Sequence, residues 1–483
     1  MTTLHEAFQY SEEALAANNL KHARSIFEQI LQNIPDEPHA INGLGVVAFR
    51  SGELSEAEDY HRRAIALRDD NPTFHANLFL VYFKQGRLSE AIACCRRALE
   101  LEPESSNLHG NFGVALRADG QLDEAIASFR RALELDPGDV NTRYNLGNAL
   151  VARENFAEAE SEFRRATELA PGDFQSHNNL GALLQHLGRY DDAMEAFGVA
   201  LRHSPGSADV AYNRSLLRLL QGDYKRGWPE FEARHELPTA RQLKLQQPRY
   251  FRQPLEGKRI MIWAEQGFGD TIQMARFAPA LKQRGATVLV ECQPELRHLM
   301  RCVPGVDQIV EDIDAETFDF HISFLTLPHV METTLSTIPC EVPYVECAGE
   351  RVTHWREALS EHPGLKVGIV WQGNPEFRQD AQRSIPLAEM APLADCPDVT
   401  LVSLQKDHAT GQLADVPFGA KIVDLADKLD DFCETAAVMK NLDLVITCDS
   451  APAHLAGALA VPVWVALPFS PNWRWLLARD DSP

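Results

Sequence analysis

The first half of the chain repeats one pattern of small, aromatic and proline positions. Three blocks, beginning "NFGVALRADG", "YNLGNALVAR" and "NNLGALLQHL", align with equivalent positions 34 residues apart. The shared positions are a glycine, an alanine, a phenylalanine and a proline: Gly113, Ala125, Phe129, Pro137; Gly147, Ala159, Phe163, Pro171; and Gly181, Ala193, Phe197, Pro205. Small residues suit close helix contacts, phenylalanine fills gaps between repeats, and proline ends a helix because it lacks the N–H. The pattern predicts six helix pairs and a degenerate seventh that caps the array.

This period and pattern resemble the tetratricopeptide repeat. One repeat departs from it, with Phe79 in place of the glycine and Cys95 in place of the aromatic residue. The resemblance implies a superhelix whose concave groove binds a protein or peptide partner. A spacer or a dimerisation arm is the alternative interpretation, so a homo-oligomer stays open.

The second half alternates short apolar runs with helical periodicity. Runs such as "RIMIWAE" (259–265), "KVGIVW" (366–371) and "LDLVITC" (442–448) predict buried strands, and the segments between them predict helices. Such alternation is typical of parallel sheets covered on both faces, and a break near 345–365 predicts two Rossmann-like domains. The expected fold class is α + α/β, with the following bounds: repeat array 1–236, linker 237–257, first α/β domain 258–350, and second α/β domain 351–483.

Composition and charge exclude several classes of function. The net charge of −23 argues against nucleic-acid binding, because phosphate binding needs a basic surface. The nine cysteines contain no C-x-x-C pair, which favours a reducing cytoplasm over a disulfide framework or a zinc site. The N-terminus does not resemble a signal peptide, and no segment reaches transmembrane length. We therefore expect a cytoplasmic protein.

Polar residues gather directly after the predicted strands. They stand in "QGFGD" (266–270), "QGN" (372–374), "QK" (405–406) and "DSAPAH" (449–454). In open parallel sheets ligands bind beyond the carboxyl ends of the strands, so these segments predict one ligand-binding edge. A Rossmann dinucleotide fingerprint is weak here, since Ile272 stands at the third glycine position of G-x-G-x-x-G.

Two of these motifs carry a second resemblance, over most of 256–483. "GFGDTIQMARFAPAL" and "LVITCDSAPAHLAGALAVPVWVALP" are similar to motifs of the heptosyltransferase-like glycosyltransferases, which have a GT-B fold, and "WQGNPEFRQDAQRSIPL" resembles their donor loop. The resemblance implies a bacterial inverting glycosyltransferase with a nucleotide-diphosphate sugar as co-substrate, no other cofactor and no metal. It makes Asp270 the general base. It also implies a donor site formed by Gly267, Gly269, Gln372, Asn374, Arg383, Lys406, Asp449, Ser450, Ala451 and His454.

Each of these residues also has a purely structural interpretation. Asp270, Asp449 and Ser450 stand where helix caps are expected, since their oxygens accept bonds from free N–H groups. Gln372 and Asn374 suit turns, Arg383 and Lys406 suit a solvated surface, and His454 suits a core. The D-x-D match at Asp312 and Asp314 is attributed to chance, and "DFCE" (431–434) to a capping box.

The sequence thus favours a glycosyltransferase whose repeat groove presents a protein or peptide acceptor. A lipopolysaccharide-core heptosyltransferase is an alternative. A second alternative is a protein-interaction scaffold with an inactive GT-B-like half. It is suggested by the ending "RWLLARDDSP", after which we expect related sequences to continue with a strand and a final helix.

Overall fold

The chain forms two compact units. A computed structural model describes residues 3–377, 380–479 and 481–482. The first unit comprises Met1–Leu184 and Asp191–Pro205, and the second comprises Gln185–Tyr190 and Gly206–Pro483. The domain bounds expected from the sequence stay a prediction.

Consecutive helices occupy the described residues up to Phe231. Fourteen α-helices follow one another there: α1 Leu4–Ala16, α2 Leu20–Asn33, α3 Pro38–Ser51, α4 Leu54–Leu67, α5 Pro72–Lys84, α6 Leu88–Leu101, α7 Ser106–Ala118, α8 Leu122–Leu135, α9 Val140–Ala152, α10 Phe156–Leu169, α11 Phe174–His186, α12 Tyr190–His203, α13 Ala208–Leu220 and α14 Tyr224–Phe231. Neighbours pack as pairs, such as α3 with α4 and α7 with α8. The predicted helical repeat architecture is confirmed.

The repeated glycines make room for the repeated phenylalanines. A Cβ added at Gly113 would lie 2.6 Å from Phe129, and one added at Gly147 would lie 2.5 Å from Phe163. These distances are too short for two carbon atoms that are not bonded, so a side chain at the glycine would displace the ring. The glycine therefore sets the distance between the two helices of one repeat.

The departing repeat reverses this arrangement. Phe79 on α5 is 2% exposed and Cys95 on α6 is fully buried. The large residue has moved from the second helix to the first, and a small residue has replaced it. Both positions stay buried, since the helix pair again combines one large and one small side chain.

The last helix pair belongs to the second unit and is joined to its α/β part. Trp228 and Phe231 of α14 are buried, and both rings contact the indole of Trp473, with centroids 5.2 Å and 6.1 Å apart. A short 3₁₀ helix, η1 (Glu232–Glu236), continues directly from α14. The apolar surface at the end of α14 is thus covered by another segment of the second unit.

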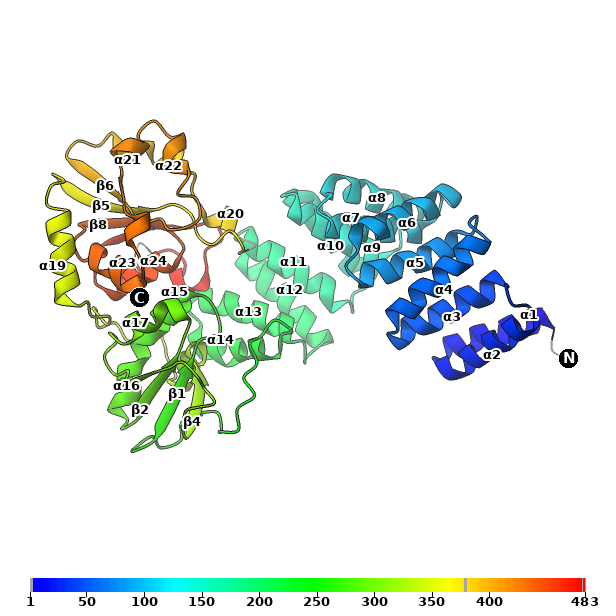
Figure 1. The fold of residues 1–483 in the computed structure, drawn as a ribbon, viewed down its shortest axis with the longest axis horizontal. Helices are drawn as coiled ribbons and strands as arrows, with labels where there is room; N and C mark the ends of the chain where they lie inside the picture. Colours follow the sequence, from blue (N-terminus) through cyan, green and yellow to red (C-terminus); the bar gives the residue numbers. More distant parts are fainter. Residues whose placement is uncertain (1–2, 378–379, 480, 483) are drawn as a thin grey trace. The chain divides into compact units, whose positions relative to one another are not determined.

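The α/β part contains two parallel sheets in the described residues (Figure 1). The first has the strand order β3-β2-β1-β4, and the second has the order β7-β6-β5-β8-β9. Their strands are β1 Arg259–Trp263, β2 Thr287–Glu291, β3 Gln308–Val310, β4 Phe320–Ser323, β5 Leu365–Val370, β6 Val399–Ser403, β7 Val423–Asp424, β8 Leu444–Cys448 and β9 Val463–Ala466. All their pairings are parallel, which confirms the predicted fold class.

Helices connect these strands, as the alternating pattern predicts. They are α15 Phe268–Met274, α16 Ala278–Gln283, α17 Arg297–Met300, α18 Leu327–Val330, α19 Gly349–Ala358, α20 Asp380–Arg383, α21 Ala391–Ala394, α22 Gln412–Asp415, α23 Phe432–Met439 and α24 Ala451–Ala458. The short 3₁₀ helices are η2 Ala275–Phe277, η3 Pro294–Leu296, η4 Phe324–Thr326, η5 Leu387–Met390, η6 Gly419–Lys421, η7 Ala426–Lys428 and η8 Trp473–Trp475.

Two elements are not evident from the sequence. β4 consists of the four residues "FHIS", two half-buried and then two buried, a run too short and too polar to stand out. α19 lies in the segment that the pattern presents as a break, because it buries only Trp355 and has a weak apolar face. Among the described residues, no helix combines the length and the apolar composition needed to cross a membrane.

Candidate functional site

Both sheets have a topological switch point next to their first strand. In the first sheet the chain proceeds from β1 to β3 on one side and then places β4 on the other side of β1. The second sheet does the same with β5 to β7 and then β8. Ligands of open parallel sheets bind in the crevice beyond the carboxyl ends at such points. The segments that follow β1, β4, β5 and β8 therefore define the candidate site.

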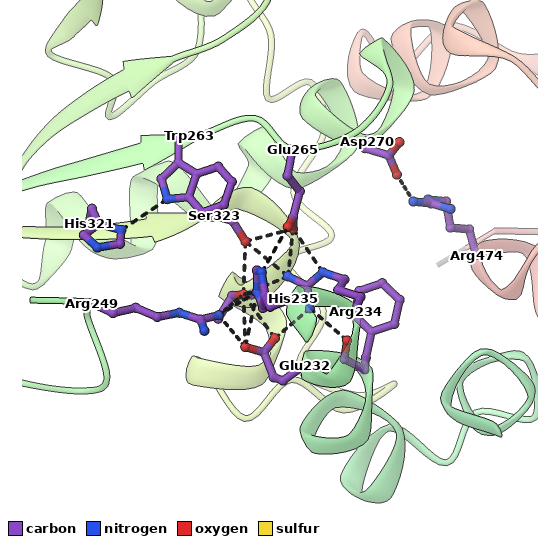
Figure 2. A network of polar contacts seen from close by, with 12 residues as sticks. Glu232, Arg234, His235, Arg249, Trp263, Glu265, Asp270, His321, Ser323 and Arg474 are labelled. Atoms are coloured by element: carbon purple, nitrogen blue, oxygen red, sulfur yellow. Dashed lines mark hydrogen bonds and ion pairs between the residues drawn. The ribbon is translucent and has the colours of Figure 1, made fainter. Parts of the chain in front are cut away.

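Asp270 lies in the first turn of α15, just beyond β1. Its Oδ2 accepts a hydrogen bond of 3.0 Å from the backbone N–H of Gly267, so the capping interpretation is confirmed. Its Oδ1 accepts a hydrogen bond from Nη2 of Arg474, and the two side chains form an ion pair (Figure 2). Both carboxylate oxygens are engaged, and the catalytic role of Asp270 stays a prediction.

The start of α15 packs directly on α24 of the second sheet. A Cβ added at Gly269 would lie 2.6 Å from Cδ2 of His454 and 3.6 Å from Cα of Ala451. The His454 ring stacks on Trp475, with centroids 5.4 Å apart and planes inclined by 13°. Burial lowers the pKa of His454 to about 4, so the imidazole is neutral at neutral pH. The two motifs that carry the glycosyltransferase resemblance thus meet through a glycine.

Asp449 and Ser450 connect β8 to α24. Burial raises the pKa of the Asp449 carboxyl, while the charge of Arg383 opposes the increase. The Ser450 hydroxyl donates to the carbonyl of Cys448 at 3.3 Å and makes no capping bond to α24. The expected capping by the Ser450 side chain is therefore wrong. Ser450 acts through its backbone, since its carbonyl accepts the N–H of Ala453 at 3.0 Å.

Arg383 is held beside this turn. Its Nη1 donates to the carbonyl of Asp449 at 2.8 Å, and its Nε donates to Oδ1 of Asp380 at 2.9 Å. The guanidinium also lies over the ring of Phe377 at 4.9 Å. With 21% of its side chain exposed, Arg383 is not the solvated surface charge offered as an alternative.

Gln372 and Asn374 follow β5. The backbone N–H and carbonyl of Gln372 are both bound by the side chain of Gln405, each at 3.1 Å, and its side-chain oxygen accepts from Gln412 at 3.3 Å. Asn374 accepts the N–H of Glu376 at 3.0 Å, which is the turn role expected as its structural alternative. Residues 378 and 379 of the expected donor loop lie outside the described residues.

A pocket of about 350 Å³ opens beside this loop. It is lined by Gln372, Pro375, Asp380, Ala381, Ser384, Ile385, Pro386 and Gln412. Asp380 is 3% exposed, forms an ion pair with Arg383, and accepts a hydrogen bond of 3.0 Å from the hydroxyl of Ser384. The lining offers amide and hydroxyl groups against apolar walls.

Lys406 is placed differently from the other candidates. Its exposed ammonium donates to the carbonyl of Leu429 at 2.5 Å and to that of Asp430 at 3.4 Å. Within the described residues, no hydrogen bond or ion pair joins Lys406 to Arg383 or Asp449. The structure thus groups Gly269, Asp270, His454, Asp449 and Arg383, and leaves Lys406 at the end of β6.

A network of charged and polar side chains lies beyond the ends of β1 and β4 (Figure 2). Arg234, from η1, donates to Glu265 at 2.7 Å and to Ser323 at 3.1 Å. Arg249 forms an ion pair with Glu232. Burial alone would raise the pKa of the Glu232 carboxyl, but the positive charges of Arg234 and Arg249 outweigh burial, so the pKa is lowered. These partners satisfy the buried charges and fix η1 to the first sheet.

His235 belongs to the same network. Its Nε2 lies 3.3 Å from the hydroxyl of Thr326 and 2.8 Å from a guanidinium nitrogen of Arg249. Burial and the neighbouring charge of Arg234 lower the pKa of His235 to about 4. Nearby, the indole N–H of Trp263 donates to His321 at 3.3 Å.

Sequence reasoning missed several of these residues. Glu265 is the last residue of the predicted strand 259–265, so the rule did not select it, whereas Gln405 stands in the selected segment "QK", of which only Lys406 was expected in the donor site. Arg474 carried no signal, because its carboxylate partner lies 204 residues earlier in the chain. Only the fold brings that pair together.

The remaining acidic motifs have local roles. Asp431 caps α23 by accepting the N–H of Glu434 at 2.8 Å, while the Glu434 carboxylate accepts from the indole of Trp355. The capping box is therefore half formed. Asp312 accepts the N–H of Asp314 in a turn. In the described part of the chain, His, Cys, Asp and Glu side chains form no group of three or more that could hold a metal ion.

Comparison with known families assigns two regions of the chain. The family model described as glycosyltransferase family 9 (heptosyltransferase) matches residues 388–467. A tetratricopeptide repeat model matches 175–202, and the model of the C-terminal domain of cilia and flagella-associated protein 70 matches 7–183. The chain therefore combines tetratricopeptide repeats with a heptosyltransferase-like region, as the sequence predicted.

A curated relative and several solved structures are similar to the chain. Protein FlbA of Caulobacter vibrioides is 25% identical over 293 residues, which cover 53% of this chain and 48% of that protein. The chain thus spans about half the length of this relative. The repeat protein YrrB is 22% identical over 39% of this chain and 98% of its own, with a TM-score of 0.35. A tetratricopeptide repeat protein from Parabacteroides merdae is 20% identical over 47% of this chain and 90% of its own, with a TM-score of 0.41.

Proposed function

We propose that the second unit is an inverting glycosyltransferase that uses a nucleotide-diphosphate sugar. One observation carries the proposal: α15, with its carboxylate Asp270, touches α24, whose first turn follows Asp449. A carboxylate that follows the first sheet thus lies close to a helix that follows the second sheet, and the N-terminus of such a helix can receive a diphosphate. The match of 388–467 to glycosyltransferase family 9 supports the same reaction class.

The proposed residues divide the chemistry between them. The oxygen of an acceptor hydroxyl attacks the anomeric carbon of the donor, and Asp270 takes the hydroxyl proton. The bond from that carbon to the phosphate oxygen breaks, and the nucleoside diphosphate leaves with the electron pair. Arg383, beside Asp449, is the cation best placed to stabilise the leaving diphosphate. A positioned base of this kind contributes about 10²–10⁴-fold to the rate.

The donor-binding roles rest on the second sheet. Ser450 and Ala451 would contact the diphosphate at the start of α24, with Asp449 on the sugar. Gly267 and Gly269 permit the close approach of α15, and the neutral His454 closes the site from one turn further along α24. The pocket beside Gln372 would accommodate part of the donor.

The repeat array is proposed to bind the acceptor or a partner that carries it. Tetratricopeptide folds present a continuous groove to protein or peptide segments, which favours a protein acceptor. Because the matched family is one of heptosyltransferases, a saccharide or lipid-linked acceptor is the alternative substrate.

A catalytically inactive scaffold is the competing function. The observation that favours it is the engagement of both Asp270 oxygens, one by Gly267 and the other by Arg474. A carboxylate held by a guanidinium is a weaker base than a free one.

The deciding experiment combines donor binding with turnover on the full chain. Calorimetry and thermal shift would be run with UDP, GDP, ADP and dTDP and with their sugars, since a specific ligand stabilises the fold by mass action. We expect one nucleotide to bind, and Arg383→Ala to abolish that binding. Arg356→Ala, an exposed arginine on α19, is the matched control and should bind normally.

Turnover would be followed as release of nucleoside diphosphate from the bound donor. Asp270→Asn should keep donor affinity and lose at least about 100-fold in kcat. Asp314→Asn, an exposed aspartate in a turn, should retain full activity. Absence of nucleotide binding to well-folded protein would reject the transferase and leave the scaffold.

A further inference from the structure

The residues of η8 and the asparagine before it connect three parts of the second unit. This segment, Asn472–Trp475, reads "NWRW" and follows β9. Trp473 contacts the last repeat helix, Arg474 contacts α15 of the first sheet, and Trp475 contacts α24 of the second sheet. Three consecutive side chains therefore bridge elements that are far apart in the sequence.

Arg474 is a buried cation with a fixed orientation. Its side chain is 8% exposed, and burial lowers its pKa to about 10. Its three nitrogens are bound separately: Nη2 by Asp270, Nε by Gln273 at 2.9 Å, and Nη1 by Asn472 at 2.7 Å. The guanidinium also lies over the ring of Trp473, 4.3 Å from its centroid. A planar guanidinium with a hydrogen bond at each of its three nitrogens has little freedom to rotate.

The support for this guanidinium comes from the repeat side. The Trp473 indole is 6% exposed and packs edge-on against Trp228 at 5.2 Å, with planes inclined by 88°. Phe231 contacts the same indole. Because Arg474 stacks on this ring, the end of the repeats defines where the guanidinium lies.

The carboxylate of Asp270 retains capacity for chemistry. A carboxylate offers about four lone-pair sites on its two oxygens, and the N–H of Gly267 and Arg474 occupy one on each. The remaining sites can accept a proton from a hydroxyl. The two bonds fix the plane of the carboxylate, which a single bond to Gly267 would leave free to rotate.

From this geometry we infer that Arg474 is a positioning residue for the base Asp270, supported by the end of the repeat array through Trp473. The inference rests on the proposed glycosyl transfer. Arg474 acts through Asp270 and fixes the direction of its free lone pairs toward the acceptor. It also binds the first sheet to the segment that contacts α24, so the base and the donor helix keep one relative placement.

The first test establishes the contact in solution without any substrate. Denaturation midpoints would be measured for Asp270→Asn, Arg474→Gln and the double variant of the full chain. Each single change should lower the midpoint, and the double variant should lose less than the sum of the two, since the partners share one interaction. Additive losses would overturn the inference.

The second test measures turnover with the nucleotide sugar that binds the wild-type chain, as release of nucleoside diphosphate. Arg474→Gln should lower kcat about 10–100-fold, because small misplacements of a reacting group cost this much, and should change the donor KM less than about 3-fold. Arg474→Lys should recover part of kcat, since it keeps the charge. Arg479→Gln, which removes an exposed arginine paired locally with Asp481, is the control and should behave as wild type.

The outcomes separate this inference from the proposed function. A wild-type chain that turns over no donor refutes the transferase, and the role of Arg474 is rejected with it. An active wild type with an equally fast or faster Arg474→Gln variant rejects the positioning role alone. The positioning role is also rejected if Arg474→Gln and Arg474→Lys lose kcat equally and the donor KM rises by the same factor, because that pattern indicates a structural effect.

Discussion

Replacement of Gly269 by alanine should separate the two helices that form the candidate site. The new Cβ would lie 2.6 Å from Cδ2 of His454, whereas carbon atoms in contact prefer about 3.5–4.0 Å. The overlap is thus about 1 Å. His454 cannot rotate away freely, because its ring stacks on Trp475.

The size of the effect follows from two opposing contributions. Overpacking of this kind typically costs about 1–3 kcal/mol. Alanine is favoured over glycine inside a helix by roughly 1 kcal/mol, and by less in the first turn, where Gly269 stands. The steric term dominates, so we expect Gly269→Ala to lower the free energy of unfolding by about 1–2 kcal/mol.

Urea denaturation of the full chain, followed by tryptophan fluorescence, would measure this change. The matched control is Gly457→Ala, a glycine of α24 whose added Cβ meets no atom within 4 Å. It should stabilise the protein by about 0.5–1 kcal/mol through helix propensity alone.

Equal stability of Gly269→Ala and Gly457→Ala would contradict this prediction. Such a result would mean that α15 and α24 do not approach each other in solution as closely as Gly269 and His454 require. The double variant Gly269→Ala with His454→Ala would test which group is displaced. If it loses less stability than the two single variants together, His454 is the group that the new methyl obstructs.

Three further predictions concern packing and protonation. Burial lowers the pKa of His61 from 6.5 to about 4, so the unfolded chain binds a proton at this residue before the folded protein does. The free energy of unfolding should therefore fall by up to about 3 kcal/mol as the pH falls from about 6.5 to 4. In denaturation curves His61→Phe should remove this part of the pH dependence. Gly147→Ala should destabilise the repeats by about 1–3 kcal/mol despite its better helix propensity, because its Cβ would lie 2.5 Å from Phe163, and an unchanged melting temperature would contradict this. Trp473→Ala should cost about 3–5 kcal/mol of stability by removing the contact with Trp228, whereas a loss below about 1 kcal/mol would show that the contact is not formed.

Much of the fold could be predicted because its signals are local and repeated. A 34-residue period fixes where helices begin and end, and the glycines of the pattern lie against phenylalanines as their sizes require. Continuous apolar runs located eight of the nine strands found in the described residues, all except β4. That strand was missed because its pattern resembles a loop, and α19 because its sequence has little amphipathic contrast.

The candidate site was predictable only as a set of positions. The rule that ligands bind beyond the carboxyl ends of strands selected Asp270, Asp449 and His454 without any coordinates. The same rule cannot tell which of the selected residues meet. In the fold Gly269 reaches His454, whereas Lys406 turns to the carbonyl of Leu429.

The sequence by itself determined the helical repeats, the two parallel sheets and the segments that end at their carboxyl edges. These properties depend on periodicity and on residue size, which act between neighbours in the chain. Only the tertiary structure decided that Arg474 pairs with Asp270, that Arg234 pairs with Glu265 just beyond β1, and that Trp473 packs on α14. Charges and rings attract across space regardless of their separation in sequence, so such partners are selected by how the elements pack, and no local pattern records the choice.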